Sequence, residues 1–278
     1  MPGLIRVFPR RTSFTPTDDM AFVGEPPLDR PEADEVHVSC VFTWDIPTAR
    51  RLQLAWAQYY PVVKLGGPAI DGVVDGFVPG RYIREGVTFT SRGCNHRCRH
   101  CLVPEREGKF RILSDISPGW IIQDNNVLQG GMEHLRRVIA MLRQQNRAVT
   151  FSGGLEAALV TQDVVDLLRT IKVNELYLAC DSPANVSAMQ RAATLLTPHF
   201  GRRQLRCYVL IGPNQEASLC RLECCWDYGL LPFAQLFQPA DRLIEYSPEW
   251  RHLAREWSRP AAMFASHARA KTCQQREI

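Results

Sequence analysis

This sequence has few lysines, and it has neither a long apolar run nor a second CxxC cysteine pair. No run of about 18 apolar residues occurs, so we expect no transmembrane helix and no membrane partner. The first 14 residues contain arginines but no apolar core segment, so we expect no secretory signal and infer a cytoplasmic, reducing setting. In that setting the ten cysteines are expected to be free or metal-bound rather than paired in disulfides.

Lysine is rare, because only four of the 33 basic residues are lysines and the other 29 are arginines. The planar guanidinium group of arginine suits phosphate recognition, although a GC-rich genome gives the same bias without a functional cause. The net charge of +4 falls short of the strongly basic balance of a dedicated nucleic-acid binder. Charge alone therefore leaves nucleic-acid binding open.

The first part of the chain divides into two segments by composition. Residues 1–36 are rich in proline and charge, so we predict an extended arm without a core of its own. Residues 37–86 are predicted to form a small α/β extension of strand, helix and strand, in which Asp45 caps the helix.

Strand and helix patterns alternate from residue 87 onward. Strands are predicted at 87–91, 119–125, 148–154, 175–180, 205–212 and 230–237. Helices are predicted at 133–145, 161–171, 185–196 and 216–229. This alternation implies parallel pairing through right-handed crossovers. The predicted fold class is α/β, with a partial (β/α)6 TIM-like barrel over 87–240 and a C-terminal helix and frayed tail over 241–278, where Trp250 and Trp257 serve as packing anchors. In such barrels the chemistry lies where the strands end.

Three cysteines, Cys94, Cys98 and Cys101, lie in the stretch VTFTSRGCNHRCRHCLVPEREGK just after the first of these strands. A zinc site would need a fourth ligand, for which His96 or His100 is available. Structural zinc loops usually draw their ligands from two cysteine pairs, however, and no second CxxC pair occurs. Three thiolates on one loop also suit an iron–sulfur cluster with one open iron.

The segment CNHRCRHC resembles the CxxxCxxC motif of the radical S-adenosylmethionine (radical SAM) superfamily. Its flanks resemble the branch of the tRNA methylthiotransferases and cobalamin-associated enzymes, and the resemblance covers roughly residues 87–237. It implies a 4Fe-4S cluster on Cys94, Cys98 and Cys101 with S-adenosyl-L-methionine (SAM) on the open iron. One electron from an external flavodoxin or ferredoxin type donor then cleaves SAM to a 5′-deoxyadenosyl radical, which abstracts hydrogen from the substrate.

The resemblance also implies residues that bind SAM. It places His100 beside the adenine, and it assigns the other contacts to residues at the strand ends: Asp124, Asn125 and Asn126 for the methionine amino group, Gly153 and Gly154 for close backbone approach, Asp181 and Ser182 for the ribose or carboxylate, and Ile211 and Gly212 for the adenine. The alternative interpretations are a tight turn at the two glycines and a helix cap at Asp181.

Further cysteines and charged residues have two interpretations each. If Cys207 faces the inside of the barrel, it could donate a hydrogen atom; the alternative is that it is a small buried hydrophobe. Because side chains alternate along a strand, Cys207 faces inward only if its neighbours Arg206 and Tyr208 face outward. Cys220 and Cys224 share a helix face, which is too little for a second cluster. The charged residues after the third cysteine either contact the substrate or are solvated, and we favour the solvated interpretation; they are Glu105, Arg106, Glu107 and Lys109.

The segments on either side of the cysteine motif make some radical SAM reactions less consistent with this chain than others. Cys40 stands alone before residue 94 and no strand-rich tail follows residue 240, which disfavours a methylthiotransferase, and residues 37–70 are too few to enclose a corrin. The chain is similar to compact bacteriophage radical SAM proteins. This resemblance implies an isomerase acting in DNA modification on an amino-acid adduct of a flipped thymine base, in the host cytoplasm. The alternatives are a radical SAM enzyme for a peptide or small metabolite, and a noncatalytic zinc or iron–sulfur module that binds nucleic acid.

Overall fold

The computed structural model describes residues 3–72, 77–212, 214–239 and 243–274, with side chains up to His267 in the last helix. The chain is an α/β protein with sheets of parallel strands and two compact units. The first unit holds Met1–Gly119 with Pro239–Leu243, and the second holds Trp120–Gln238 with Ile244–Ile278. The packing boundary thus falls near residue 119, whereas the sequence predicted a boundary at residue 86.

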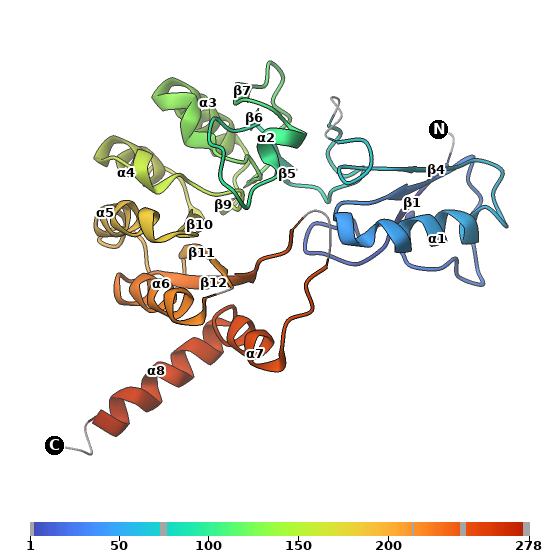
Figure 1. Cartoon of the computed structure of the whole chain (residues 1–278). Coiled ribbons are helices and arrows are strands. Elements are labelled where there is room, and N and C mark those ends of the chain that lie inside the picture. The colour runs from blue at the N-terminus through green and yellow to red at the C-terminus, as the bar shows by residue number, and fades with distance from the viewer. Residues whose placement is uncertain (1–2, 73–76, 213, 240–242, 275–278) are drawn as a thin grey trace. The chain divides into compact units, whose positions relative to one another are not determined.

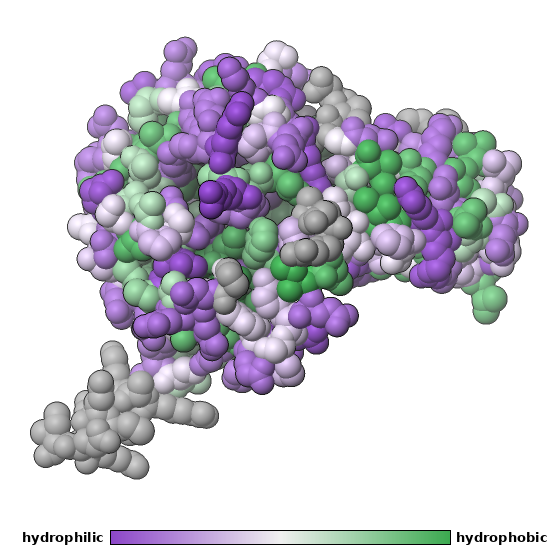
Figure 2. Space-filling view, viewed as in Figure 1, coloured by the Kyte–Doolittle hydropathy of each residue, from purple (hydrophilic) through white to green (hydrophobic). Residues whose placement is uncertain are grey.

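The first unit contains a four-stranded parallel sheet in the order β2-β1-β3-β4. Its strands are β1 (Leu4–Phe8), β2 (Ala21–Val23), β3 (Glu35–Ser39) and β4 (Val63–Gly66). A short 3-10 turn, Thr43–Asp45, leads into helix α1 (Ile46–Trp56), which lies along this sheet (Figure 1). Leu54 on α1 is 72% exposed, and Figure 2 shows hydrophobic residues between hydrophilic ones over this helix.

The predicted extended arm is wrong for the first strand. β1 is an inner strand of the sheet, and its Ile5 and Val7 are fully buried with Trp56 of α1. The five residues LIRVF form a strand because two neighbouring strands pair with them. The prolines and charged residues around this segment make its strand pattern hard to recognise in the sequence. The strand and helix predicted within 37–86 are confirmed by β3, α1 and β4.

The rest of the first unit carries short elements around the three cysteines. They are β5 (Val87–Thr88), β6 (Ser91–Arg92), α2 (Val103–Arg106) and β7 (Arg111–Ile112). The strand predicted at 87–91 is therefore two short strands, because β6 turns aside to pair antiparallel with β7. The cysteines lie in the long connection between these two paired strands.

The second unit alternates strand and helix as predicted. Its strands are β8 (Ile121–Ile122), β9 (Val149–Phe151), β10 (Val173–Ala179), β11 (Leu205–Ile211) and β12 (Leu231–Leu236). Its crossover helices are α3 (Gly131–Gln144), α4 (Gln162–Leu168), α5 (Val186–Leu196) and α6 (Gln215–Asp227), and its 3-10 turns are Val127–Gly130, Ala157–Leu159 and Pro183–Asn185. The strands are parallel and lie in sequence order from β8 to β12.

The helices α3 to α6 lie along one side of these strands (Figure 1). Strands that follow one another in order, each joined to the next by a right-handed crossover, keep their helices on one face. The core lies between that face and the helices, where Leu135 and Val138 of α3 meet Phe151 and Leu176 of the sheet. Among the described residues, the crossover helices of this unit all lie on that one face (Figure 1).

The end of the chain adds α7 (Pro248–Glu256) and α8 (Pro260–Gln274) to the second unit. Trp257 is 7% exposed and Trp250 packs on the same core, so the prediction of packing anchors is confirmed. The expected fraying of the final dozen residues is not seen up to Gln274, and residues 275–278 lie outside the described part. Among the helices that the structure describes, none is both long and apolar enough to cross a membrane.

Candidate functional site

The three cysteines predicted as cluster ligands lie on turns of the first unit. Cys94 and Cys101 are half-buried and Cys98 is exposed. Across residues 3–72, 77–212, 214–239 and 243–274, no three Cys, His, Asp or Glu side chains are grouped so that they could hold a metal ion. His100, predicted to lie beside the adenine, is exposed on the same turn.

The base of the cysteine loop is tightly held. The backbone N–H of Gly93 donates to Glu107 Oε2 at 3.1 Å, and Arg92 forms an ion pair with Glu107 at 3.7 Å. The N–H of Cys94 donates to the carbonyl of Gly108 at 3.2 Å. A Cβ on Gly93 would lie 2.2 Å from the Lys109 carbonyl oxygen, so only glycine fits. The prediction that Glu107 is merely solvated is wrong, because its side chain is only 10% exposed.

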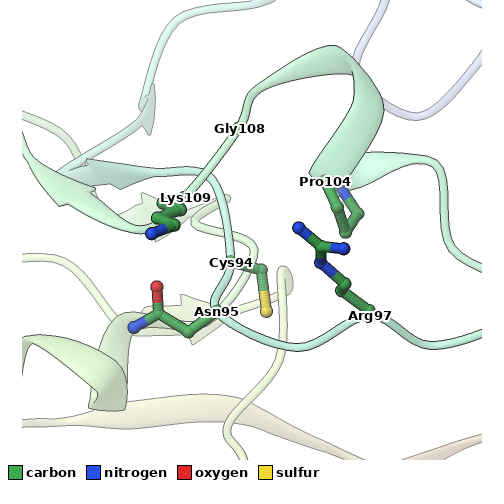
Figure 3. A pocket seen from close by; sticks show the side chains of 6 residues that line it. All are labelled: Cys94, Asn95, Arg97, Pro104, Gly108 and Lys109. Carbon is green, nitrogen blue, oxygen red and sulfur yellow. The ribbon is translucent and has the colours of Figure 1, made fainter.

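A depression of about 410 Å³ lies beside Cys94. Its lining residues all belong to the first unit: Cys94, Asn95, Arg97, Pro104, Gly108 and Lys109. Figure 3 shows the Cys94 sulfur between the side chain of Asn95 on one side and that of Arg97 on the other. The charges of Arg97 and Lys109 would offset the negative charge of metal-bound thiolates. In its chemistry, the donor set fits an iron–sulfur cluster.

The residues predicted after β8 are buried at the carboxyl edge of the second sheet. Asp124 is 1% exposed and Asn126 is 6% exposed, and Asn125 is half-buried between them. The amide Nδ2 of Asn126 donates to Glu156 Oε2 at 2.6 Å. Because a carboxylate only accepts, this bond fixes the orientation of the amide and turns Oδ1 away from Glu156. Oδ1 is buried and, within the described residues, has no hydrogen-bond partner.

The two glycines after β9 lie against the end of β8. A Cβ on Gly153 would lie 1.8 Å from the backbone oxygen of Asp124, and Gly154 has a φ of +107°. Both the close approach and the left-handed turn therefore require glycine. The neighbouring Ser152 hydroxyl donates to Gln123 Oε1 at 2.6 Å. The tight-turn interpretation is confirmed, and the same contact brings two strand ends together.

The residues after β10 and β11 are at the same edge. Asp181 Oδ1 accepts a hydrogen bond from the N–H of Leu210 at 2.8 Å, so this carboxylate links two strands instead of capping the following helix. The hydroxyl of Ser182 hydrogen-bonds to Asn185. Ile211 is fully buried, and Gly212 has a φ of +108° and donates from its N–H to the Ser218 hydroxyl at 3.2 Å.

The predicted hydrogen-atom donor, Cys207, is on the helix side of the sheet. Its side chain is 0% exposed and belongs to the core with Cys180 and Cys225, and burial raises the pKa of its thiol. A thiol enclosed between the sheet and its helices has no path to a substrate, so the small-hydrophobe interpretation holds. Its neighbours Arg206 and Tyr208 therefore face the opposite side of the sheet. This decides which residues of β11 face the helices, a question that the sequence left open.

The comparisons with known proteins leave the family open. No family model matches the chain, and no curated protein is significantly similar to it.

Proposed function

We propose that this chain is a radical SAM enzyme whose cysteine loop holds a 4Fe-4S cluster and whose second sheet binds SAM. When bound, these groups supply a one-electron cleavage of the sulfonium, which yields methionine and a 5′-deoxyadenosyl radical for hydrogen abstraction. The electron comes from an external flavodoxin or ferredoxin type donor. Cys94, Cys98 and Cys101 are the ligands, because thiolate is the standard ligand of such clusters.

The observation that carries the proposal is the buried, unpartnered Oδ1 of Asn126. An acceptor left without a partner in a buried place costs free energy, and a ligand N–H at that place would satisfy it. The ammonium group of an amino acid such as the methionine part of SAM is a donor of this kind. Asp124, directly before it in the buried run, adds negative charge that suits the same cation.

The sheet geometry supports the same proposal. Sequential parallel strands with helices along one face are the arrangement of a barrel wall, so we infer a partial (β/α) barrel in the second unit. Residues at the carboxyl ends of neighbouring strands, which meet at one edge, include Asn126, Gly153, Asp181 and Gly212. Ligands of parallel α/β sheets bind at this edge. The substrate that we propose is an amino-acid-bearing nucleobase in modified DNA, which the enzyme isomerises.

The test is anaerobic incubation of the iron-reconstituted chain with SAM and dithionite, with 5′-deoxyadenosine as the product assayed. We expect product from the unchanged chain and none above background from the Cys94→Ala, Cys98→Ala, Cys101→Ala triple variant. Cys220→Ala is the matched control, because it removes an exposed cysteine from α6, away from the motif, and should leave the yield unchanged.

Metal analysis of the same samples separates the remaining outcomes. Iron and acid-labile sulfide in equal amounts, roughly four of each per chain, would support the cluster. One zinc per chain without sulfide would overturn the catalytic proposal in favour of a binding module. A loaded cluster that gives no 5′-deoxyadenosine even with modified DNA present would also overturn it.

A further inference from the structure

The face of the second sheet opposite its helices carries a set of aromatic rings around one arginine. The strand registers place Tyr177 beside Arg206, and Tyr208 beside Phe233. Because side chains alternate along a strand, these four residues lie on one face of the sheet, and their buried neighbours Leu176 and Cys207 lie on the opposite face. Three neighbouring strands, β10, β11 and β12, thus contribute to one surface.

The rings of this surface are ordered by their mutual contacts. Tyr177 and Tyr208 are stacked with centroids 4.7 Å apart, and Phe233 meets Tyr208 edge-on at 5.7 Å. The Tyr208 hydroxyl donates to the backbone oxygen of Ser152 at 2.9 Å, which ties the ring to the end of β9. Burial raises the pKa of both tyrosines, so they stay neutral at physiological pH. All three rings remain partly exposed and can offer a face to a ligand.

Arg206 is the unusual member of this surface. It is only 6% exposed, and its guanidinium lies 5.9 Å from the Tyr177 ring centroid and 5.6 Å from that of Phe233. Its Nε is buried without a hydrogen-bond partner, and no ion pair joins Arg206 to another described residue. Buried charges are normally paired, because removing an ion from water costs free energy.

Two other buried arginines also have an Nε without a hydrogen-bond partner, but their terminal nitrogens are engaged. Arg221 is equally buried and donates from Nη2 to the Leu210 carbonyl at 2.9 Å. Arg6 donates to the Gly80 and Arg81 carbonyls and forms an ion pair with Asp18. Glu175 lies on the face of Arg206, and its carboxylate accepts a hydrogen bond from the Tyr177 hydroxyl at 3.4 Å. Arg206 therefore has aromatic neighbours but, among the described residues, no carboxylate partner.

We propose that this face binds a planar ring that carries an anionic group, with the ring against Tyr177 and Tyr208 and the anion on Arg206. Arginine binds carboxylate and phosphate through paired hydrogen bonds, and a heterocycle stacks well on tyrosine. Tyr208 follows Arg206 by two residues toward the carboxyl end of β11, roughly 7 Å along the strand. The ring would thus lie nearer the carboxyl edge than the anion does.

This inference rests on the proposed function in one respect: it takes the ligand of this face to be the substrate of the radical SAM reaction. A nucleobase with an amino-acid substituent has both the ring and a carboxylate, and a nucleotide has a ring and a phosphate. Binding itself requires neither the cluster nor SAM, so it can be measured without radical chemistry.

The experiment is calorimetric titration of the full chain with two pairs of probes. Orotate is compared with uracil, and thymidine 5′-monophosphate is compared with thymidine. We expect at least one anionic probe to bind ten-fold or more tightly than its neutral counterpart, and the pair that shows the preference identifies carboxylate or phosphate as the anion. Equal affinities within both pairs, or no binding at all, would overturn the proposal.

Variants assign the preference to Arg206. Arg206→Met should abolish it, Arg206→Lys should keep part of it, and Arg191→Met, which removes an exposed arginine from α5, should leave it unchanged. Glu175→Gln should preserve or strengthen anion binding, because it removes a negative charge from that face. The Arg206→Met chain should unfold at an unchanged or higher temperature, since an unpaired buried charge is lost. A fall of more than about 5 °C would show that Arg206 holds the fold instead, and would overturn the assignment.

The two proposals fail separately. If the unchanged chain takes up no cluster on reconstitution but still binds the anionic probe, and the triple cysteine variant binds it equally well, the radical SAM proposal is overturned and the ligand surface stands. If 5′-deoxyadenosine forms but Arg206→Met keeps its anion preference, only the ligand surface is overturned.

Discussion

The two parallel sheets of this protein end in carboxyl edges of opposite character. In the first unit, Arg10 pairs with Asp45 by two hydrogen bonds, and Gly67 packs against the backbone of Cys40. In the second unit, Asn126 keeps a buried acceptor without a partner, beside Asp124 and Gly153. The first edge satisfies its own polar groups, whereas the second leaves one for a ligand. Two edges of parallel sheets in one chain thus differ in how their described polar groups are satisfied.

The strongest test of this contrast is Gly153→Ala. The added Cβ would lie 1.8 Å from a backbone oxygen that cannot move aside, so β8 and β9 must separate at their ends. We expect a loss of about 3 kcal/mol or more in unfolding free energy, measured by urea denaturation, together with loss of SAM binding. Gly201→Ala is the control, because its Cβ would meet only a glutamine side chain at 3.7 Å.

Gly67→Ala is the matching change at the first edge. Its Cβ would lie 2.7 Å from the Cys40 oxygen, and its φ is +105°, so the first unit should be destabilised to a similar degree. SAM binding per folded molecule should remain, because the second edge is untouched. If Gly67→Ala removed SAM binding as completely as Gly153→Ala, the distinction between the edges would be wrong.

The cysteine loop allows a smaller and more local test. Gly93→Ala places a Cβ 2.2 Å from the Lys109 oxygen at a φ of +73°, whereas Gly108→Ala at +75° meets nothing within 4 Å. The first change combines clash and strain, and we expect it to cost about 2–3 kcal/mol and to lower iron incorporation. The second should cost about 1 kcal/mol by strain alone. Equal iron incorporation in both variants would argue against a held loop.

Sequence patterns predicted the second unit better than the first. The strands β9 to β12 and the helices α3 to α6 each bury one face, and burial of one face requires apolar residues at regular intervals. This periodicity made the alternation after residue 119 predictable from the sequence. β1 was missed because five apolar-rich residues between prolines carry too little periodicity, and only pairing with two neighbours makes them a strand. The roles of the cysteine motif and of the strand-end residues came from the resemblance, and they stay predictions.

The sequence could not reveal contacts between distant residues. The roles of Glu107 at the loop base and of Asp181 between strands depend on partners 14 and 29 residues away. Likewise, whether Cys207 or Tyr208 faces the helices depends on the register of β11 with its neighbours. A single sequence gives the alternation of a strand but not which of its faces the helices cover.

The last effect that we predict concerns Cys40 at the first edge. Its thiol is fully buried and donates to the Phe42 carbonyl at 3.3 Å, and burial raises its pKa from 9.0 to about 11. A folded pKa above the unfolded value means that the stabilisation is complete below pH 9 and is lost as the pH rises toward 11. We expect the unfolding free energy of the unchanged chain to fall over this window by about 1–2 kcal/mol more than that of Cys40→Ser. The hydroxyl of serine keeps the bond to Phe42 but does not ionise there, so the difference between the two chains isolates the thiol. Parallel curves for the two chains would show that water reaches Cys40, and the first edge would then be as open as the second.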